Sequence, residues 1–239
     1  MIRCITFDLD DTLWAVSPVI KEANSSLFEW LAVHAPEFTR CYQLKDLVTL
    51  RRDVIKAQPD IAHSVTKIRI EQLRLGLLNV GYSPSDAGLL TQRAFEVFIQ
   101  ARQQVSFFEH AREMLVTLKE QGYQLGALSN GNADIHRVGL GDLIDFQLKA
   151  DDVGEMKPHP LMFQQMLEKT GLRPEQVIHV GDNLDHDING ASAIGIWTIL
   201  VNIVAQNDSS QATQTVCRLV DIPAAVKQIQ ETAGSRLTL

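Results

Sequence analysis

The stretch Phe7-Asp8-Leu9-Asp10-Asp11-Thr12 decides the predicted fold. It follows a short, largely apolar run from Ile2 to Phe7, which is typical of a buried parallel strand. The carboxylates begin where this strand is expected to end, and in open α/β sheets ligands bind outside the carboxyl ends of the strands. The stretch therefore predicts a parallel sheet whose first strand delivers carboxylates to a ligand site.

The same stretch indicates a chemistry. Closely spaced carboxylates repel each other unless a cation or a proton intervenes. Hard oxygen ligands favour Mg²⁺, and an Asp can attack phosphorus and carry the phosphoryl group as an acyl phosphate. The alternative is an acidic turn that caps a strand, because short motifs match by chance when they stand alone.

Composition limits the classes of protein. The 239 residues are 45% hydrophobic and 21% charged, as in a globular protein of one large or two small domains. The net charge of -7 argues against a general binder of nucleic acid or anionic membranes. No apolar run approaches the roughly 20 residues that span a bilayer, and no basic-then-apolar leader opens the chain. Three scattered cysteines suit neither a disulfide framework nor a zinc site. We expect a soluble cytoplasmic protein, a monomer or homodimer, with reduced thiols.

The chain after Thr12 changes its pattern. From about Pro18 to Gln104 the apolar residues follow helical periods, and no convincing strand interrupts them. Gly81 can end one helix, and Ser83-Pro84-Ser85-Asp86 can start another, with the serine as the N-cap and the proline at the first helical position. We therefore expect a helical cap domain at residues 17–104, inserted into a catalytic core of residues 1–16 and 105–239.

Strands and helices alternate from about Val105 onward. This alternation predicts right-handed βαβ units and an α/β fold with a doubly wound parallel sheet. The polar stretch Gln206–Thr215 is expected to be a surface loop. The expected strands are Tyr123–Leu128, Phe146–Ala150, Val177–Val180 and Ile196–Val201, and the expected helices include 161–169, a helix that ends at Ala193, and 224–232.

Polar residues also follow later strands. Ser129, Asn130 and Gly131 end the second core strand, where a hydroxyl and exposed amides suit an anion, although an ordinary turn would have the same residues. Lys157 lies in a proline-rich loop and could neutralise a phosphate as a point charge, although a loop lysine is more often solvated. Gly181-Asp182 again places a carboxylate directly after an apolar strand, and Asp187 follows five residues later.

In this order the four stretches resemble the haloacid dehalogenase-like hydrolase superfamily. The resemblance rests on Asp8-Leu9-Asp10-Asp11-Thr12, Ser129, Lys157 and Gly181-Asp182 with Asp187. It spans nearly the whole chain, since the helical insert lies where that superfamily carries its smaller cap.

The resemblance implies a role for each residue. Asp8 is expected to be the nucleophile and Asp10 the general acid/base. Thr12, Ser129 and Asn130 are expected to bind the substrate phosphate, and Lys157 to steady the nucleophile and the phosphoryl charge. Asp11 is interpreted as a turn residue. Magnesium is the implied cofactor, and its expected ligands are Asp8, the backbone carbonyl of Asp10, Asp182 and Asp187. Asp187 is expected to support the metal through a water molecule or to orient Lys157.

Asp10 separates the branches of the superfamily. In the superfamily that this chain resembles, the true dehalogenases lack a carboxylate two residues after the nucleophile, because a leaving halide needs no proton. Its presence favours a phosphatase with a small phosphate ester as substrate. The alternatives are a phosphonatase, for which one of Lys21, Lys45, Lys56 and Lys67 would have to form a Schiff base, a 2-haloacid dehalogenase and an inactive binding module.

A closer resemblance concerns the substrate. Asn130-Gly131-Asn132-Ala133, Gly139-Leu140-Gly141-Asp142 and His63-Ser64-Val65-Thr66-Lys67 look like the bacterial phosphatases of riboflavin biosynthesis, which act on flavin mononucleotide and phosphorylated ribityl-aminouracil. Trp14 could stack on a flat ring or anchor the hinge below the cap. The other candidate substrate contacts are Arg51, Arg52, His63, Thr66 and Arg69, each with a solvated or stem-buried helix residue as the alternative.

Overall fold

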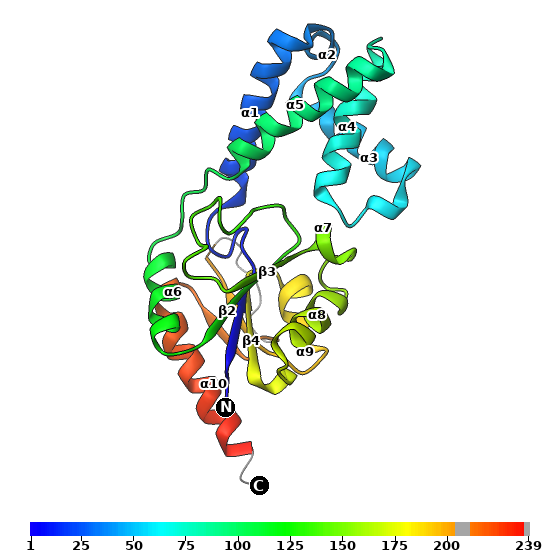
Figure 1. Ribbon diagram of the computed structural model, residues 1–239. Coiled ribbons are helices and arrows are strands. Elements are labelled where there is room, and N and C mark those ends of the chain that lie inside the picture. The colour runs from blue at the N-terminus through cyan, green and yellow to red at the C-terminus, as the bar shows by residue number, and fades with distance from the viewer. Residues whose placement is uncertain (204–210, 237–239) are drawn as a thin grey trace. The chain divides into compact units, whose positions relative to one another are not determined.

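The computed structural model describes residues 1–203 and 211–236 (Figure 1). The chain divides into two compact units, of which one runs from residue 16 to residue 105 and the other contains the remainder. The unit with the N-terminus contains the β-sheet, and the inserted unit is helical throughout. Each unit has its own hydrophobic core.

The sheet has six parallel strands among the described residues, in the order β3-β2-β1-β4-β5-β6. The strands are β1 (Cys4–Phe7), β2 (Gln124–Ser129), β3 (Phe146–Lys149), β4 (Val177–Gly181), β5 (Trp197–Val201) and β6 (Gln214–Val216). The strand order reverses between β1 and β4, and ligands of doubly wound sheets bind outside this reversal. The predicted α/β fold class is confirmed.

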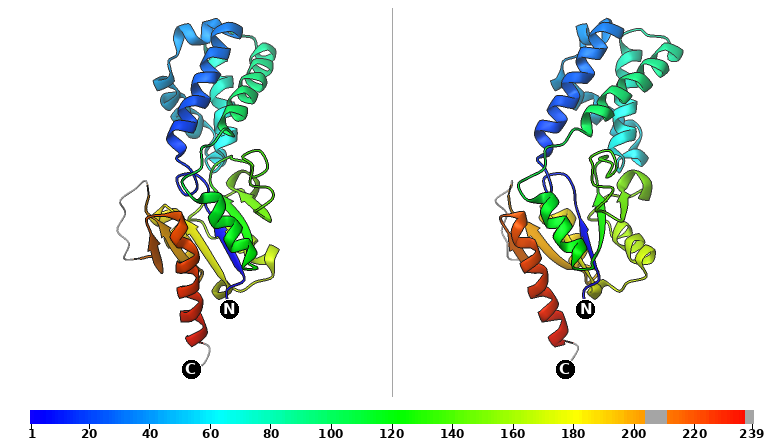
Figure 2. Two further views of the ribbon diagram at one scale, coloured as in Figure 1. Left: turned by 90° about the vertical axis from the view of Figure 1, so that its left-hand side faces the viewer. Right: turned by 60° about the vertical axis from the view of Figure 1, so that its left-hand side comes forward.

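Helices cover both faces of the sheet (Figures 1 and 2). One face carries α6 (Ala111–Glu120) and α10 (Ile222–Arg236), and the other carries α8 (Leu161–Thr170) and α9 (Gly190–Ser192). The short helix α7 (Ala150–Val153) follows β3 directly. Met162, Phe163 and Met166 of α8 pack on Cys4 and Leu128 in one buried cluster. This packing fixes β1 and β2 against α8 on one face of the sheet.

Two predictions for the core were wrong in detail. Residues 206–210 of the predicted loop lie outside the described residues, but Gln214 and Thr215 belong to the edge strand β6, which pairs with β5. An edge strand is half exposed, so polar residues do not prevent its formation. The predicted helix before Ala193 is an α-helix only at its end, because its first part is a π-helical segment, η4 (Leu184–Asn189). The amides of Asp187 and Ile188 both donate to the Asn183 carbonyl, which gives this wider turn.

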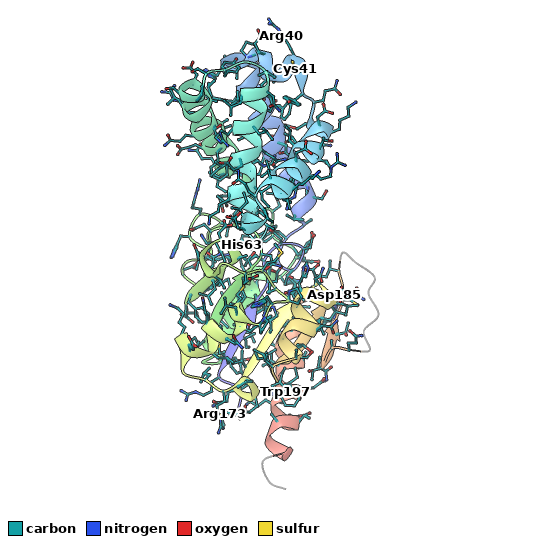
Figure 3. The ribbon with its side chains drawn as sticks, turned by 90° about the vertical axis from the view of Figure 1, so that its right-hand side faces the viewer. Arg40, Cys41, His63, Arg173, Asp185 and Trp197 are labelled. Carbon is teal, nitrogen blue, oxygen red and sulfur yellow. The ribbon has the colours of Figure 1, made fainter. Side chains whose placement is uncertain are left out.

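The helical unit packs around its own apolar cluster, to which Leu27, Leu31, Phe38, Leu73 and Leu77 contribute. Ser83 caps α5 (Pro84–Arg102) by accepting a hydrogen bond from the Asp86 amide, as predicted. Cys41 at the end of α2 (Pro36–Cys41) is exposed (Figure 3). Among the described residues, no helix has the length and apolarity needed to cross a bilayer. The helices of this unit are α1 (Val16–His34), α2 (Pro36–Cys41), η1 (Leu44–Asp46), α3 (Leu47–Ala57), η2 (Pro59–Ile61), α4 (Val65–Asn79) and α5 (Pro84–Arg102).

Candidate active site

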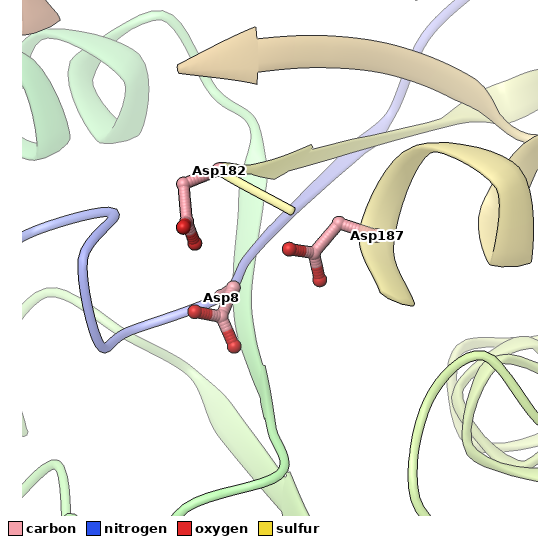
Figure 4. Close-up of side chains that lie close together, drawn as sticks. All are labelled: Asp8, Asp182 and Asp187. Atoms are coloured by element: carbon pink, nitrogen blue, oxygen red, sulfur yellow. The ribbon is translucent and has the colours of Figure 1, made fainter. Parts of the chain in front are cut away.

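Three carboxylates converge at the reversal of the strand order (Figure 4). Asp8 follows β1, Asp182 follows β4 and Asp187 lies in η4. One oxygen of each lies within 4.8 Å of the others. A cavity of about 190 Å³ opens here. Its lining includes Asp8, Asp10, Asp11, Ser129, Asn130, Gly131, Lys157, Asp182, Asn183, His186 and Asp187. The structure thus gathers most of the predicted core site residues at one place.

Lys157 is the cation of this site. Its side chain is 1% exposed, and its ammonium group donates to Asp8 Oδ1 at 2.8 Å, to Asp187 Oδ1 at 2.6 Å and to the Leu128 carbonyl at 2.6 Å. An ammonium group has three hydrogens, so these bonds occupy all of them. Lys157 therefore steadies the nucleophile directly and acts on a phosphoryl group through its charge.

His179, in the middle of β4, is a site residue that the sequence analysis missed. It is fully buried, with Nε2 3.1 Å from Asp187 Oδ1 and Nδ1 2.9 Å from Thr6 Oγ1. A carboxylate only accepts hydrogen bonds, so Nε2 donates to Asp187 and Nδ1 accepts from the threonine hydroxyl. The available signal was a histidine inside an otherwise apolar strand, two residues before Gly181.

The charges of the site shift its pKa values. Burial raises the pKa of Asp8 well above its usual value, Lys157 opposes this, and the negative charges of Asp187 and Asp182 add to it. Burial also raises the pKa of Asp182 to about 6, and Asp187 contributes. Burial would raise the pKa of Asp187 as well, but Lys157 and His179 outweigh it, and the pKa is lowered. Burial lowers the pKa of His179, which keeps the imidazole neutral.

These residues fit a magnesium ion. One buried ammonium group lies among three carboxylates, and burial together with the negative charge of Asp187 raises the pKa values of Asp8 and Asp182. A divalent cation with oxygen ligands offsets the negative charge of the carboxylates and keeps both of them ionised. The expectation for Asp10 concerned its backbone carbonyl, which the side-chain geometry does not test.

The three residues predicted to bind phosphate differ in their hydrogen-bond partners. Ser129 is buried at the cavity, and its Oγ accepts a hydrogen bond from the Gly131 amide at 3.0 Å, so its hydroxyl hydrogen can still be donated elsewhere. Thr12 is fully buried and its Oγ1 donates to Asp182 Oδ1 at 3.1 Å, not into the cavity. The Asn130 side chain donates to the Lys157 carbonyl at 2.9 Å and accepts from the Lys157 amide at 2.7 Å. Asn130 therefore fixes the backbone of the loop that carries Lys157, a role that was not predicted.

Asp10 and Trp14 form a pair. The indole Nε1 of Trp14 donates to Asp10 Oδ1 at 2.8 Å. The Trp14 side chain is fully buried, so no face of the ring is open for stacking on a substrate, and the alternative of a buried anchor fits its placement. Asp11 has a φ of +60°, which agrees with its interpretation as a turn residue.

The remaining candidates belong to the helical unit. Arg51 and Arg52 are exposed on α3, and His63 (Figure 3) and Thr66 are half-buried. The guanidinium of Arg69 lies 4.4 Å from the centre of the Phe98 ring. Burial and the charge of Arg51 lower its pKa to about 10. Their contact with a substrate stays a proposal.

Two larger cavities lie at the opposite end of the sheet. They have volumes of about 430 and 310 Å³ and are lined by residues near the amino ends of the strands, including Arg3, Arg173 and Trp197. In Figure 3, Arg173 and Trp197 lie toward one end of the core and Asp185 lies toward the other. Two further cavities, of about 510 and 500 Å³, lie elsewhere on the core. Asp8, Asp182 and Asp187 line none of these four larger cavities, so size does not identify the site among the described residues.

Comparison with known proteins agrees with this geometry. A family model described as haloacid dehalogenase-like hydrolase matches residues 2–195. The chain is 33% identical to the 5-amino-6-(5-phospho-D-ribitylamino)uracil phosphatase YigB of Escherichia coli K12, over 82% of this chain and 81% of that protein. It is 30% identical to the glyceraldehyde 3-phosphate phosphatase of Pyrococcus furiosus, over 83% of this chain and 80% of the relative.

A solved structure described as 2-haloacid dehalogenase from Pseudomonas syringae pv. Tomato DC3000 is also similar. Its TM-score is 0.90 at 33% identity, and the match covers 95% of this chain and 99% of that chain. Proteins similar to this chain thus carry names from two reaction classes. The side chains of the site have to distinguish between these classes.

Proposed function

This chain belongs to the haloacid dehalogenase-like hydrolases, and we propose that it is a magnesium-dependent phosphatase that acts through an aspartyl phosphate on Asp8. Its similarity to curated phosphatases supports a phosphoric monoester hydrolase. The observation that carries the proposal is the buried Lys157–Asp8 contact beside Asp10 and the carboxylate cluster. This arrangement supplies a nucleophile, an acid and a site for a metal ion.

The reaction has two steps. A carboxylate oxygen of Asp8 attacks phosphorus, the bond from phosphorus to the leaving oxygen breaks, and Asp10 gives its proton to the departing alkoxide. Asp10 then takes a proton from a water molecule that attacks the same phosphorus. The bond between phosphorus and Asp8 breaks, and inorganic phosphate leaves.

The surrounding residues stabilise charge and hold geometry. Lys157 keeps Asp8 oriented through the 2.8 Å contact, and its positive charge offsets the phosphoryl oxygens. Ser129 can donate its hydroxyl hydrogen to one of these oxygens. Bound magnesium would supply further positive charge beside Asp8, Asp182 and Asp187.

The proposed substrate is flavin mononucleotide or the phosphorylated ribityl-aminouracil of riboflavin biosynthesis. The similarity to YigB supports it, as do the local matches around Asn130, Gly139 and His63. Another small phosphate ester is the alternative within the same chemistry. One such ester is glyceraldehyde 3-phosphate, which the name of a second relative gives as its substrate.

A second reaction class is a 2-haloacid dehalogenase, favoured by the structural similarity to the Pseudomonas syringae protein. Such an enzyme also uses an aspartate nucleophile, but its leaving halide needs no proton. Asp10 lines the cavity and is held by a hydrogen bond, which fits a reaction in which an alkoxide leaves.

The decisive experiment measures phosphate release with Mg²⁺ from flavin mononucleotide, sugar phosphates, nucleoside monophosphates, phosphoglycolate and pyridoxal phosphate, and halide release from 2-chloropropionate. We expect phosphate release that stops in chelator and in Asp8→Asn, with the highest kcat/KM for flavin mononucleotide. Slow turnover of every ester would leave the chemistry in place and contradict flavin mononucleotide as the substrate. Halide release without phosphate release would replace the phosphatase by a dehalogenase.

A further inference from the structure

We propose that Trp14 is a positioning residue for Asp10, whose carboxyl group it holds in the orientation required for proton transfer to the leaving oxygen. The inference rests on the proposed function, in which Asp10 is the general acid/base. It assigns to Trp14 a role in the chemical step instead of contact with the substrate.

The contact constrains both side chains. The indole Nε1 donates to Asp10 Oδ1 at 2.8 Å, and Trp14 has no solvent exposure. An indole group has one hydrogen to donate and nothing with which to accept. Leaving a buried donor without a partner is unfavourable, so the rotamer of Asp10 that meets the indole is favoured. The proton that Asp10 transfers is then carried by its other oxygen, Oδ2.

Trp14 can hold Asp10 because it is itself fixed. The Asp11 amide donates to the Trp14 carbonyl at 2.7 Å, and the Leu13 amide donates to the Leu9 carbonyl at 2.8 Å. The indole ring meets the Phe107 ring edge-on, with 5.6 Å between centroids. Asp10 is only half-buried and lines the cavity. The half-buried acid is thus held by a rigid, buried neighbour four residues further along the chain.

The location of Trp14 gives the contact a second consequence. Trp14 and Phe107 form an antiparallel bridge, and the Phe108 amide donates to the Leu13 carbonyl at 2.8 Å. Both residues of this bridge belong to the core, and the helical unit between them begins at Val16 and ends at Val105. The orientation of Asp10 therefore depends on the two segments through which the chain leaves and re-enters the core.

The test uses the acidity of the leaving group. A nitrophenolate ion leaves with little help from an acid, whereas an alkoxide needs the proton of Asp10. We would measure kcat/KM with Mg²⁺ for p-nitrophenyl phosphate and for the panel's best alkyl phosphate, flavin mononucleotide in the first instance. In Trp14→Phe the ring remains and the N–H is lost. We expect kcat/KM for the alkyl ester to fall by about 10-fold to 100-fold, part of the roughly 10²–10⁴-fold effect of a general acid. The aryl ester should lose less than about 3-fold, since it needs that acid least.

Trp197→Phe is the matched control, because Trp197 Nε1 also donates a hydrogen bond, to the Glu175 carbonyl at 3.1 Å, toward the opposite end of the sheet (Figure 3). It should leave the alkyl-to-aryl ratio unchanged. In an Asp10→Asn background, Trp14→Phe should have no further effect on the alkyl ester, since coupled residues are not additive. A ¹⁵N-edited NMR spectrum gives a readout without activity, because Asp10→Asn should shift the one indole signal that Trp14→Phe removes.

The outcomes separate this inference from the proposed function. Equal losses for both esters in Trp14→Phe, with a lower Tm, would reduce Trp14 to a structural residue and overturn the inference, and so would unchanged activity or an indole signal that ignores Asp10→Asn. If the unmodified protein released phosphate from neither ester, the proposed function itself would fail.

Discussion

At the scale of single residues, the buried side chains of the site are held by hydrogen bonds to one another. Lys157 donates its three hydrogens to Asp8, Asp187 and the Leu128 carbonyl. Asp187 accepts from Lys157 and His179 with one oxygen and from the Asn183 amide with the other. A network whose members are all satisfied has few alternative arrangements, so small changes near it should affect catalysis strongly.

Gly181 offers the sharpest change of this kind. A Cβ at this position would overlap with the side chain of Asp187, whereas a Cβ at Gly88 in α5 would meet no atom within 4 Å. We predict that Gly181→Ala displaces Asp187 and lowers kcat by about 100-fold, the order expected for a misplacement near 1 Å. Gly88→Ala is the control and should keep full activity. A fully active Gly181→Ala would show that the position of Asp187 is not required.

His179 gives a prediction about orientation. His179→Leu leaves Asp187 without one donor, and we predict that kcat falls by about 10-fold to 100-fold with little change in KM, as is typical when the partner of a metal-site ligand is removed. His179→Gln can still donate to Asp187 and should recover most of kcat. Steady-state kinetics of both variants, with the exposed His136→Leu as control, checks this. Equal losses in the Leu and Gln variants would contradict the orienting role.

The sequence predicted these residues to different degrees. Asp8, Lys157, Asp182 and Asp187 were predicted because carboxylates and a lysine at strand ends form a recognisable order along the chain. His179 was not predicted, because its role depends on which residue of a neighbouring element it faces. Trp14 was predicted as an anchor or a stacking ring, and its bond to Asp10 follows only from the turn between them.

At the scale of elements, loops after different strands build the site and bonds between the loops keep it together. Asn130 follows β2 and binds the backbone of Lys157, 27 positions further along the chain, through both ends of its amide. Gly190 lets α9 approach Pro158 in the same lysine loop. The position of Lys157 is therefore set by two neighbouring elements in addition to its own loop.

The two hydrogen bonds between Asn130 and the Lys157 backbone can be tested by Asn130→Ala. The variant loses two hydrogen bonds, each with a net contribution of about 0.5–1.5 kcal/mol, and Lys157 loses its support. We predict a lower Tm and a fall in kcat of about 10-fold, since the lysine no longer holds Asp8 in place. Asn79→Ala removes an exposed amide that donates to the Tyr42 hydroxyl at 3.2 Å and should change neither. A lower Tm with unchanged kcat would show that the hydrogen bonds between Asn130 and Lys157 contribute to stability and not to catalysis.

The elements themselves were predictable where the apolar pattern is strong. The first strand and the cap of α5 by Ser83 follow from local residues. The edge strand β6 has a polar sequence that local pattern assigns to a loop, and only its pairing with β5 makes it a strand. The π-helical form of η4 likewise depends on which amides reach the Asn183 carbonyl, and hydrophobic periodicity does not report this.

At the scale of the whole molecule, the two units should respond differently to magnesium. The three converging carboxylates belong to the unit with the sheet, and the helical unit has a separate hydrophobic cluster. A ligand that binds only the folded state stabilises it by about 2.7 kcal/mol at a concentration about 100 times Kd. For a unit of this size, where 1 kcal/mol shifts the Tm by about 2–4 °C, we expect the Tm of the core to rise by roughly 5–11 °C. If the units unfold as separate transitions in calorimetry, only one should move with Mg²⁺.

The pH dependence of this shift follows from Asp182. Burial raises its pKa in the folded, metal-free protein to about 6, above the usual value of 3.8. The folded state therefore keeps a proton that the unfolded chain has released, so this stabilising contribution is complete below about pH 4 and is lost as the pH rises through about 6. Magnesium needs the ionised carboxylate, so its binding strengthens over the same interval. We predict that Mg²⁺ raises the Tm little at about pH 5 and clearly at about pH 7.5, whereas Asp182→Asn shows a weak shift at both. Thermal unfolding with Mg²⁺ and with chelator measures it, and an equal shift at both pH values would show that Asp182 does not control the metal site.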